Sequence, residues 1–432
     1  MTAARTNWAG NVTFRAARHH RPTSIGQLQA LVARADRVRA LGTGHSFNRL
    51  ADTEGDLVSV AGLPKLLEID STGRTVTVGA GMRYGELGSP LHEKGFALHN
   101  LGSLPHISVA GAVATGTHGS GCSNGNLSTA VRALQLVTPD GETVALDRDR
   151  DGATFPGAVV ALGALGIVTH LTLALVPAFE IRQYVYDGLP YDRLIEHLDE
   201  ILSAAYSVSV FTDWREPVSC QVWLKRRTGD HTQEPTSRWL GARLADGPRH
   251  PLAGMSPAAC TPQLGQAGPW HERLPHFQLG STPSRGEELQ SEYFVARESA
   301  AGALGAVARL TAQVAPVLQT AEIRTIAADD LWLSPAYRRD SVALHLTWIA
   351  DAIAVAPVVA AVEGAGTLRG TSALGQGVQH RAVGRVSSVR AGGRLRGSGA
   401  AVRPCRRLAQ RPSRSVLPDR GLTRCRVQAL RG

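Results

Sequence analysis

The chain has 432 residues, of which 43% are hydrophobic and 5% aromatic, so it is long enough for two domains with substantial cores. Its five cysteines are widely spaced and form no C-x-x-C pair, which argues against a disulfide framework and against a zinc site. Residues 1–10 lack the apolar core of a signal peptide, and no stretch is apolar over the thickness of a bilayer. We therefore expect a cytoplasmic protein with no membrane contact and no metal.

The net charge of +10 is concentrated in one segment. Residues 361–432 contain fifteen arginines, no lysine and two acidic residues, so they carry +13, and residues 1–360 carry −3. The same segment has twelve glycines and none of the 22 aromatic residues. Because such a composition buries little apolar area, we predict that residues 361–432 form a disordered tail behind a mildly acidic body.

Residues 1–178 predict an α+β domain in which short strands alternate with glycine-rich turns. Apolar residues at helical spacing predict a helix over Tyr84–Lys94 that ends at Gly95. Strands are expected at Val38–Leu41, Leu57–Val60, Leu66–Ile69 and Thr75–Val78, and a hairpin at Val131–Val137 and Thr143–Leu146 around the turn Thr138–Gly141.

Residues 179–360 predict a second domain with an antiparallel sheet, interpreted as a substrate or cap domain. A helix is expected over Ala300–Val317. Alternating polar and apolar residues predict strands at Ser207–Phe211, Gln221–Leu224, Glu322–Ala327 and Val342–Trp348, the last two as neighbours in one sheet.

Two glycine-rich stretches carry the strongest chemical signal. Leu41–Phe47 follows a predicted strand, and Ser103–Gly121 mixes glycine with serine and threonine. Residues without bulk let backbone N–H groups approach an anion, and hydroxyls add donors, which together suit the pyrophosphate of a dinucleotide cofactor. Glycines that only make tight turns explain the composition equally well. Neither stretch fits G-x-G-x-x-G or a P-loop.

Several segments resemble a known family. Leu41–Asn48, Asn100–Gly121 and Gly163–Val168 are similar to the flavin domain of the vanillyl-alcohol-oxidase superfamily. With further segments, the resemblance is to its alditol-oxidase members and covers about residues 6–362. These further segments are Asn7–Asn11, Phe211–Trp214, Val222–Arg226, Gly268–Phe277 and Glu322–Arg324.

The resemblance implies a two-subdomain FAD-binding domain of the PCMH type and FAD held covalently through His45. A tether would retain the cofactor and raise its potential. The residues implied in cofactor binding are Leu41, Gly42, Thr43, Gly44, His45, Ser46, Ser103, Ser108, Gly111, Ala112, Val113, Ala114, Thr115, Gly116, Ile167 and Val168.

The resemblance further implies that a linear polyol such as xylitol or sorbitol is oxidised at its terminal hydroxyl to an aldose, with O2 reduced to H2O2. Arg324 matches the cationic catalytic residue. Ser103, Glu322, Arg324, His345 and Thr347 match positions that hold substrate. Without the resemblance, Glu322 and Arg324 read as a surface pair on one strand face. The protein is expected to act as a monomer, without nucleic acid.

The resemblance ends at residue 362, where the family has a His-Trp-Gly-Lys motif and this chain has none. With free choice of third bases, the codons of Glu363–Gln379 read one base later permit that motif, so we interpret residues 361–432 as a reading-frame product. Since the family's lysine is thought to lie beside the substrate hydroxyl, the sequence predicts an impaired enzyme.

Two other functions compete with this interpretation. An aldonolactone oxidase or dehydrogenase of the same superfamily would share the flavin domain. The second alternative interprets the arginine-rich tail as a nucleic-acid-binding arm, although the tail lacks the lysines and aromatic residues that usually accompany such arms.

Overall fold

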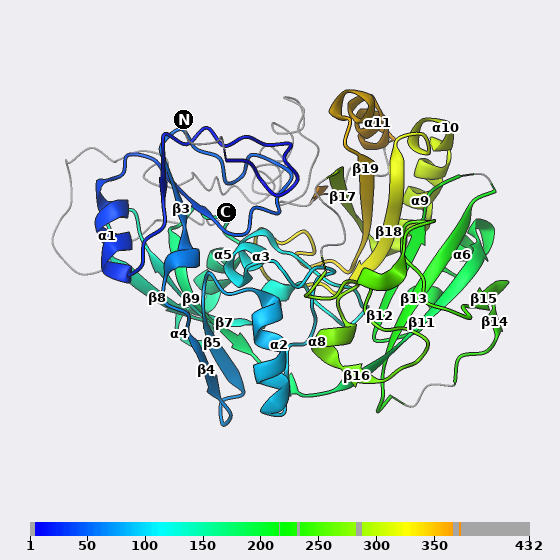
Figure 1. Cartoon of the computed structure of the whole chain (residues 1–432), viewed down its shortest axis with the longest axis horizontal. Helices are drawn as coiled ribbons and strands as arrows, with labels where there is room; N and C mark the ends of the chain where they lie inside the picture. The colour runs from blue at the N-terminus through cyan, green and yellow to red at the C-terminus, as the bar shows by residue number, and fades with distance from the viewer. Residues whose placement is uncertain (1–4, 216, 231–233, 282–286, 366–370, 373–432) are drawn as a thin grey trace, which may run out of the picture.

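The structure is a computed structural model of the chain, and it describes residues 5–215, 217–230, 234–281, 287–365 and 371–372. The predicted tail and the reading-frame interpretation lie outside the described residues, except for residues 361–365 and 371–372. Two bodies lie side by side, one with a three-stranded and a five-stranded sheet and one built on a ten-stranded sheet (Figure 1). The described chain is therefore α+β, as predicted.

A small parallel sheet opens the first body. It consists of β1 (Arg18–His20), β3 (Asp56–Ser59) and β2 (Val38–Leu41), in that order. Helix α1 (Ile25–Arg34) begins after Ser24, whose side chain accepts a hydrogen bond from the backbone N–H of Gln27. Leu28 and Val32, four positions apart, bury one face of the helix against this sheet.

The second sheet of this body is antiparallel. Its order is β4 (Leu67–Asp70), β5 (Thr75–Gly79), β9 (Ile167–Ala174), β7 (Val131–Val137) and β8 (Thr143–Asp147), and a separate pair joins β6 (Phe96–Ala97) to β10 (Val176–Pro177). The hairpin of β7 and β8 confirms the prediction. Its turn needs Gly141, because the backbone there has a φ of 86° that residues with side chains rarely adopt.

Four further short helices of the described chain belong to the first body. They are α2 (Tyr84–Glu93), α3 (Val109–Thr115), α4 (Arg148–Asp151) and α5 (Phe155–Val159). Helix α2 confirms the predicted helix within one residue, and it buries Leu87 and Leu91. Helix α3 is short because Gly116 turns the chain into the left-handed region directly after it.

The ten-stranded sheet forms the second body. Its order is β14 (Arg238–Trp239), β15 (Ala242–Leu244), β11 (Glu180–Pro190), β13 (Ser219–Arg227), β12 (Ser207–Thr212), β18 (Leu318–Ile326), β19 (Ser341–Ile349), β17 (Glu288–Ala296) and β20 (Thr371–Ser372), and β16 (Gly268–Pro269) pairs with β11. The pairing of β18 with β19 confirms the predicted neighbours.

Helices cover one face of this sheet and leave the other for the pocket. They are α6 (Tyr191–Glu196), α7 (Leu198–Leu202), α9 (Ala300–Ala308), α10 (Thr311–Val314) and α11 (Ala352–Gly364), and α8 (Trp270–Arg273) lies beside α2. Ile323, Leu344 and Leu346 pack under these helices. Because side chains alternate along a strand, Glu322 and His345 point to the opposite face.

One predicted helix differs from the structure. The expected continuous helix over Ala300–Val317 is two helices, α9 and α10, with Arg309 and Leu310 between them. Gly302 and Gly305 weaken the helical preference of this segment, and Pro316 ends it. Helix α11, which was not predicted, crosses residue 360, where the second predicted domain ends. The proposed domain boundaries stay predictions.

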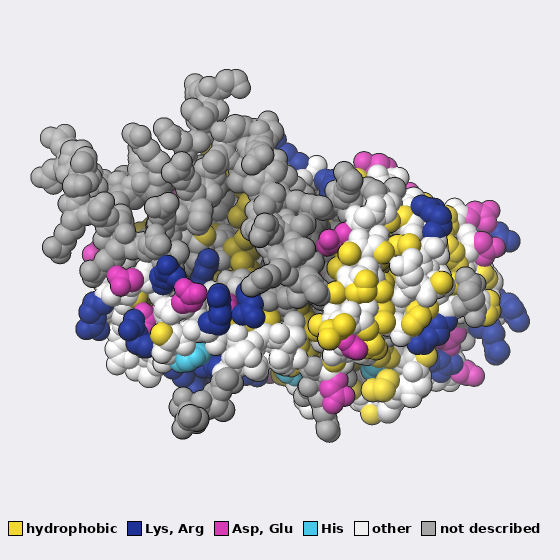
Figure 2. All heavy atoms as spheres, turned by 90° about the horizontal axis from the view of Figure 1, so that it is seen from above, with side chains coloured by type: hydrophobic (Ala, Val, Ile, Leu, Met, Phe, Trp, Pro, Cys, Tyr) yellow, Lys and Arg dark blue, Asp and Glu magenta, His cyan; other side chains and the backbone are white. Residues whose placement is uncertain are grey.

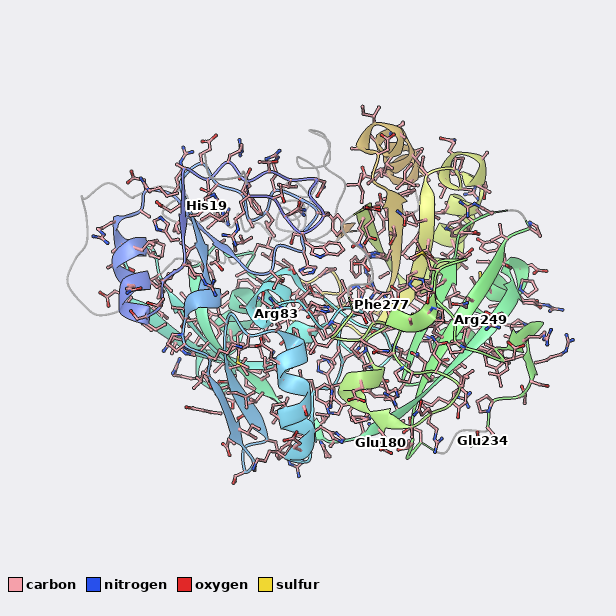
Figure 3. The ribbon with its side chains drawn as sticks, in the orientation of Figure 1. His19, Arg83, Glu180, Glu234, Arg249 and Phe277 are labelled. Atoms are coloured by element: carbon pink, nitrogen blue, oxygen red, sulfur yellow. The ribbon has the colours of Figure 1, made fainter. Side chains whose placement is uncertain are left out.

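The two bodies are joined by backbone hydrogen bonds. The N–H of Gly121 donates to the carbonyl of Thr325 at 3.0 Å, and the N–H of Ala327 donates to that of Asn124 at 2.9 Å. Arg83 of the first body and Phe277 of the second both lie toward the middle of the molecule, whereas Glu180 and Glu234 lie at its periphery (Figure 3). The strand that carries Glu322 is therefore tied directly to the glycine-rich loops.

The outer surface is mixed in charge. On the face shown in Figure 2, the described basic and acidic side chains are interspersed. Ile353 of α11, which is 88% exposed, is the most exposed of the large hydrophobic residues in the described chain. None of the helices in the described part of the chain combines the length and the apolarity that a bilayer crossing needs.

Candidate active site

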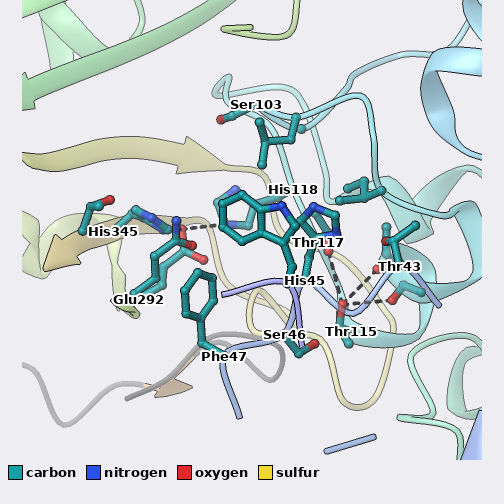
Figure 4. Close-up of a pocket in the computed structure, with 18 of the residues that line it drawn as sticks. Thr43, His45, Ser46, Phe47, Ser103, Thr115, Thr117, His118, Glu292 and His345 are labelled. Atoms are coloured by element: carbon teal, nitrogen blue, oxygen red, sulfur yellow. Dashed lines mark hydrogen bonds and ion pairs between the residues drawn. The ribbon is translucent and has the colours of Figure 1, made fainter. Parts of the chain in front are cut away.

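A pocket lies between the glycine-rich loops and the polar face of the ten-stranded sheet (Figure 4). All the predicted substrate contacts line it, namely Ser103, Glu322, Arg324, His345 and Thr347. Most of the predicted cofactor contacts line it as well, namely Leu41, Gly42, Thr43, Gly44, His45, Ser46, Ser103, Ser108, Gly111, Ala112, Thr115 and Gly116. The two predicted sets therefore share one cavity.

The loop over residues 42–48 is held from outside by the N-terminal segment. The N–H of Trp8 donates to the carbonyl of Gly44 at 2.8 Å, and the side-chain amide of Asn7 donates to the carbonyl of Ser46 at 3.0 Å. The amide of Asn11 donates to the carbonyl of Phe47 at 3.1 Å. The asparagines thus satisfy loop carbonyls that no strand or helix would pair.

His45 lies in this loop as a neutral imidazole. Its ring stacks on Trp8 with centroids 5.2 Å apart, and its Nδ1 is buried without a hydrogen-bond partner among the described residues. Burial, with the nearby positive charges of His106 and Arg83, lowers the pKa of His45 to about 4. At neutral pH the ring is uncharged and its buried nitrogen is available to a bound group.

Two glycines make a close approach between the loop and helix α3. A Cβ at Gly42 would stand 2.5 Å from Oγ of Ser108, and one at Gly111 would stand 2.7 Å from the same atom. That hydroxyl is buried without a hydrogen-bond partner among the described residues. Since a buried hydroxyl costs about 1–3 kcal/mol when unpaired, Ser108 indicates a ligand group at this wall.

Four predicted cofactor contacts, Val113, Ala114, Ile167 and Val168, are not part of this wall. Val113 and Ile167 are buried in apolar clusters on either side of the five-stranded sheet. The carbonyl of Ala114 accepts a hydrogen bond from the N–H of Leu162. In this pocket these residues support the wall rather than form it, and their contact with the cofactor stays a prediction.

The opposite wall is a row of residues that strand pairing sets side by side. Phe211, Glu322, His345 and Glu292 are direct partners across β12, β18, β19 and β17. Gln290 and Thr347 form the next rung toward one end. Because strand register alone aligns these residues, the sheet fixes their positions and no flexible loop is needed to do so.

Arg324 is the buried cation of this wall. Its Nη2 donates to Oε1 of Glu292 at 2.7 Å, its Nη1 lies 3.4 Å from Oγ of Ser103, and its Nε is 3.6 Å from Oε1 of Glu322. Burial opposes its charge, but the two carboxylates outweigh this and raise the pKa of Arg324. The alternative interpretation of Arg324 and Glu322 as a surface pair is wrong, since both residues are buried.

Glu292 is a site residue that sequence reasoning missed. Its Oε1 lies 2.7 Å from Nη2 of Arg324, 3.2 Å from Nε2 of His118 and 3.6 Å from Nδ1 of His345 (Figure 4). Burial raises its pKa, but His118 and Arg324 outweigh burial and hold the pKa of Glu292 well below its usual range. The sequence signal that could have identified it is the spacing of Glu288, Gln290 and Glu292, which places three polar side chains on one face of a strand.

His276 was missed as well. Its Nε2 lies 2.7 Å from Oε1 of Glu322, and its backbone N–H donates to the carbonyl of Ser103 at 3.1 Å. Burial raises the pKa of Glu322, but Arg324 and His276 outweigh it and hold that pKa below the usual range. Glu292 and Glu322 therefore both stay ionised, and they accept hydrogen bonds only.

The residues present fit a flavin dinucleotide. One wall offers two glycines where side chains would collide, and a hydroxyl at Ser108 and an imidazole nitrogen at His45 that have no hydrogen-bond partner among the described residues. These features suit a large group with anionic and aromatic parts. The other wall offers fixed charges for a small hydrophilic molecule. A cofactor on one side and a polyhydroxylated substrate on the other satisfy both walls.

Residues 16–147 match the family model described as FAD binding domain. Together with the two-body fold, this match defines the chain as an FAD-binding oxidoreductase. A solved structure titled solvent-stable cholesterol oxidase has the same fold, with a TM-score of 0.65, 16% identity and coverage of 84% of this chain and 83% of its own.

Sequence relatives define the family more narrowly. An alditol oxidase from a Streptomyces species is 51% identical over 366 residues, which are 84% of this chain and 86% of that protein. An L-gulono-1,4-lactone dehydrogenase from Mycobacterium tuberculosis is 29% identical over 364 residues, 80% of this chain and 83% of that protein. The chain belongs to the alditol oxidase family of FAD-binding proteins.

Proposed function

We propose that this chain oxidises the terminal hydroxyl of a linear alditol, such as xylitol or sorbitol, with FAD as electron acceptor and O2 as final oxidant. The observation that carries the proposal is the buried row of Glu322, His345 and Glu292 around Arg324, facing a glycine-lined cofactor wall. The similarity to an alditol oxidase over most of both chains supports the substrate class.

When bound, FAD would accept a hydride from the carbon that bears the hydroxyl, and O2 would then take the two electrons and two protons, one from the hydride and one from the hydroxyl, to give H2O2. The protein has to stabilise the oxygen from which the proton departs. Arg324 suits this role, because its buried guanidinium keeps its charge and its Nε has no hydrogen-bond partner among the described residues. We assign it as the catalytic cation.

The remaining polar groups suit the neighbouring hydroxyls of a polyol. Ionised Glu322 accepts from a hydroxyl, whereas Ser103 and Thr347 both donate and accept. His345 lies between the two carboxylates in the sheet register. An alditol has a hydroxyl on every carbon, so a mixed array of donors and acceptors leaves none of them unpaired and buried.

We also propose that His45 holds FAD covalently. A tether through a histidine needs an uncharged ring nitrogen, and burial supplies it by lowering the pKa of His45 to about 4. The stacking of Trp8 on the ring supports a fixed orientation of that nitrogen. Acid precipitation of the purified protein should leave yellow, fluorescent material in the pellet, and a His45→Ala variant should leave a colourless one.

Xylitol and an aldonolactone distinguish this function from its alternative. Under anaerobic conditions, xylitol should bleach the visible absorbance of the FAD-loaded protein, and L-gulono-1,4-lactone should not. Peroxide should then appear when air is admitted. Bleaching by the lactone alone would favour the dehydrogenase activity named for the mycobacterial relative, and no bleaching by either compound would contradict both functions.

We further propose that this chain is impaired in the reaction because residues 361–432 replace the family's C-terminal segment. The support is in the sequence, which lacks the His-Trp-Gly-Lys motif that the family resemblance calls for. A chain whose segment is restored in the alternative reading frame should bleach faster with xylitol than this chain. Equal rates in the two chains would refute the proposal.

We propose a cytoplasmic monomer that works without nucleic acid. The cysteines Cys122, Cys220 and Cys260 are free thiols, which suits a reducing compartment. A sedimentation experiment at several protein concentrations tests the monomer, and a DNA retention assay at low salt tests the absence of a nucleic-acid partner.

A further inference from the structure

Lys225 of β13 places a buried ammonium group behind the substrate wall. The residue is 1% exposed, and its Nζ donates to the carbonyl oxygens of Leu274 and Pro275. The same atom lies 3.0 Å from Nδ1 of His276. Three acceptors around Nζ match the three protons of an ammonium group, so the site is built for a charged lysine.

The contact with Lys225 determines which nitrogen of His276 carries the proton. An ammonium group only donates, so Nδ1 accepts and the ring proton lies on Nε2. Nε2 then donates to Oε1 of Glu322 at 2.7 Å, and the hydroxyl of Ser209 is a more distant neighbour at 3.4 Å. Lys225 thereby makes His276 a hydrogen-bond donor to Glu322.

Packing prevents His276 from leaving this position. Its ring makes edge contacts with Trp223 and Phe211, at centroid distances of 5.3 and 5.5 Å. Its backbone N–H donates to Ser103, and its carbonyl accepts from the N–H of Thr261 at 2.9 Å. The ring is therefore held from its sides and from its backbone, and only its tautomer is left to be set.

We propose that Lys225 is a positioning residue for alditol recognition, which acts through His276 to hold Glu322 as an oriented, acceptor-only carboxylate. One carboxylate oxygen of Glu322 then accepts a hydrogen bond from the ring of His276, and the other accepts a hydrogen bond from a substrate hydroxyl. The proposal rests on the proposed function, since it assigns Glu322 to that hydroxyl. It adds a side chain that does not line the pocket.

The charges around Lys225 give the proposal a pH signature. Burial lowers the pKa of Lys225 to about 7, and the charge of Arg324 acts in the same direction. The carboxylate of Glu322 and the thiol of Cys260 act in the opposite direction and raise it. Burial and Lys225 lower the pKa of His276 to about 4. Above pH 7 the neutral amine of Lys225 has only two protons for its three acceptors, so it no longer fixes the tautomer of His276. The orientation of Glu322 is then lost, and the affinity for the polyol falls as the pH rises through about 7.

The first test reads the tautomer of His276 directly, without substrate. Full-length protein incubated with FAD and labelled with ¹⁵N-histidine is compared with Lys225→Met, which keeps the length of the side chain and removes the donor. At pH 6 the unmutated protein shows His276 neutral with its proton on Nε2, and Lys225→Met shows a mixed or protonated ring. An unchanged ring in the variant overturns the proposal.

The second test measures xylitol binding by anaerobic calorimetry. Lys225→Met raises the dissociation constant about tenfold, as the loss of one oriented charge-assisted hydrogen bond implies, and removes the fall in affinity above pH 7. Lys65→Met is the matched control, because Lys65 pairs with Glu86 on the surface. An unchanged constant and pH profile in Lys225→Met overturn the proposal.

A pair of His276 variants tests the arrangement without altering the lysine, also if Lys225→Met does not fold. The amide of Gln reaches the place of Nε2 and donates to Glu322, whereas that of Asn ends near Nδ1. His276→Gln keeps xylitol binding within about threefold and His276→Asn loses about tenfold. Equal losses overturn the proposal. If the unmutated protein does not bind xylitol, the proposed function fails, and the tautomer still reports on Lys225.

Discussion

The two walls of the pocket recognise their ligands by different physical means. The wall from the first body is made of glycines, hydroxyls and backbone, and a missing Cβ at Gly42 and Gly111 shapes it. The wall from the ten-stranded sheet is made of buried charges, with Arg324 between Glu292 and Glu322. The difference teaches that shape selects the cofactor and fixed charge selects the substrate, so mutations should separate the two functions.

The largest effect is expected from removing the cation of the charged wall. Arg324→Met should slow the reduction of bound flavin by xylitol by about 10²–10³-fold, because the departing proton leaves an oxygen with no stabilising charge. Stopped-flow absorbance under anaerobic conditions measures this rate. The flavin content should stay unchanged, since Arg324 belongs to the other wall.

Arg37→Met is the matched control for that variant, because Arg37 pairs with Glu54 on the surface. It should alter neither rate nor flavin content. If Arg324→Met lost its flavin along with its activity, the separation of the two walls would be wrong.

The next effect concerns pH and the cofactor-free protein. The pKa of His45 is about 4 in the fold against 6.5 ordinarily, so the unfolded chain binds the proton more readily between these values. Stability is therefore lost as the pH falls from 6.5 to 4, by up to about 3 kcal/mol from this residue. Urea unfolding at several pH values measures the loss.

His45→Gln should flatten part of that acid-side slope, because its amide does not titrate. The slope due to His276, whose pKa is also about 4, belongs to the charged wall and should remain in the variant. An identical slope before and after the substitution would mean that His45 is not a buried neutral ring.

A smaller effect is expected from filling the glycine wall. The Cβ of Gly42→Ala would stand 2.5 Å from Oγ of Ser108, so this hydroxyl has to move and the gap to Gly111 narrows. FAD should bind about tenfold more weakly, the equivalent of about 1.4 kcal/mol. Fluorescence titration with FAD measures it in a cofactor-free His45→Ala background, where no covalent bond to the cofactor can form.

Gly26→Ala is the control for that experiment. A Cβ at Gly26, in helix α1, meets nothing within 4 Å, so FAD binding should not change. The helix should even gain about 0.5–1 kcal/mol, because alanine favours helix over glycine.

The smallest effect is expected from one neutral hydroxyl of the charged wall. Thr347→Val keeps the shape of the side chain and removes a donor and acceptor from the pocket. The xylitol concentration at half-maximal rate should rise about fivefold, with the maximal rate and the flavin content little changed. A large loss of maximal rate would place Thr347 in the chemistry rather than in binding.

Without the family resemblance, the sequence indicates the cofactor wall but not the substrate wall. Strand Val38–Leu41 and the glycines that follow it are local signals, and the structure has them where the pattern indicated. Glu292 owes its role to His118, Arg324 and His345, which lie far from it in the chain. Only strand register brings these together, and alternation along one strand does not reveal the partners.

The same limit explains Lys225 and the split helix. Lys225 reads as an ordinary basic residue at the end of an apolar run, because its acceptors come from a loop some fifty positions later. The interruption at Arg309 and Leu310 leaves buried apolar residues in both α9 and α10. Periodicity indicates that such residues are helical but not where the helix is interrupted.

The backbone hydrogen bonds between Gly121 and Thr325 and between Asn124 and Ala327 also affect how the protein unfolds. They join the loop that holds Gly121 and Asn124 in the first body to the chain at the end of β18 in the second body. Heating should therefore melt both bodies in one calorimetric transition rather than two. The pocket lies between the two bodies, so the cofactor and substrate sites should be lost together when these hydrogen bonds break.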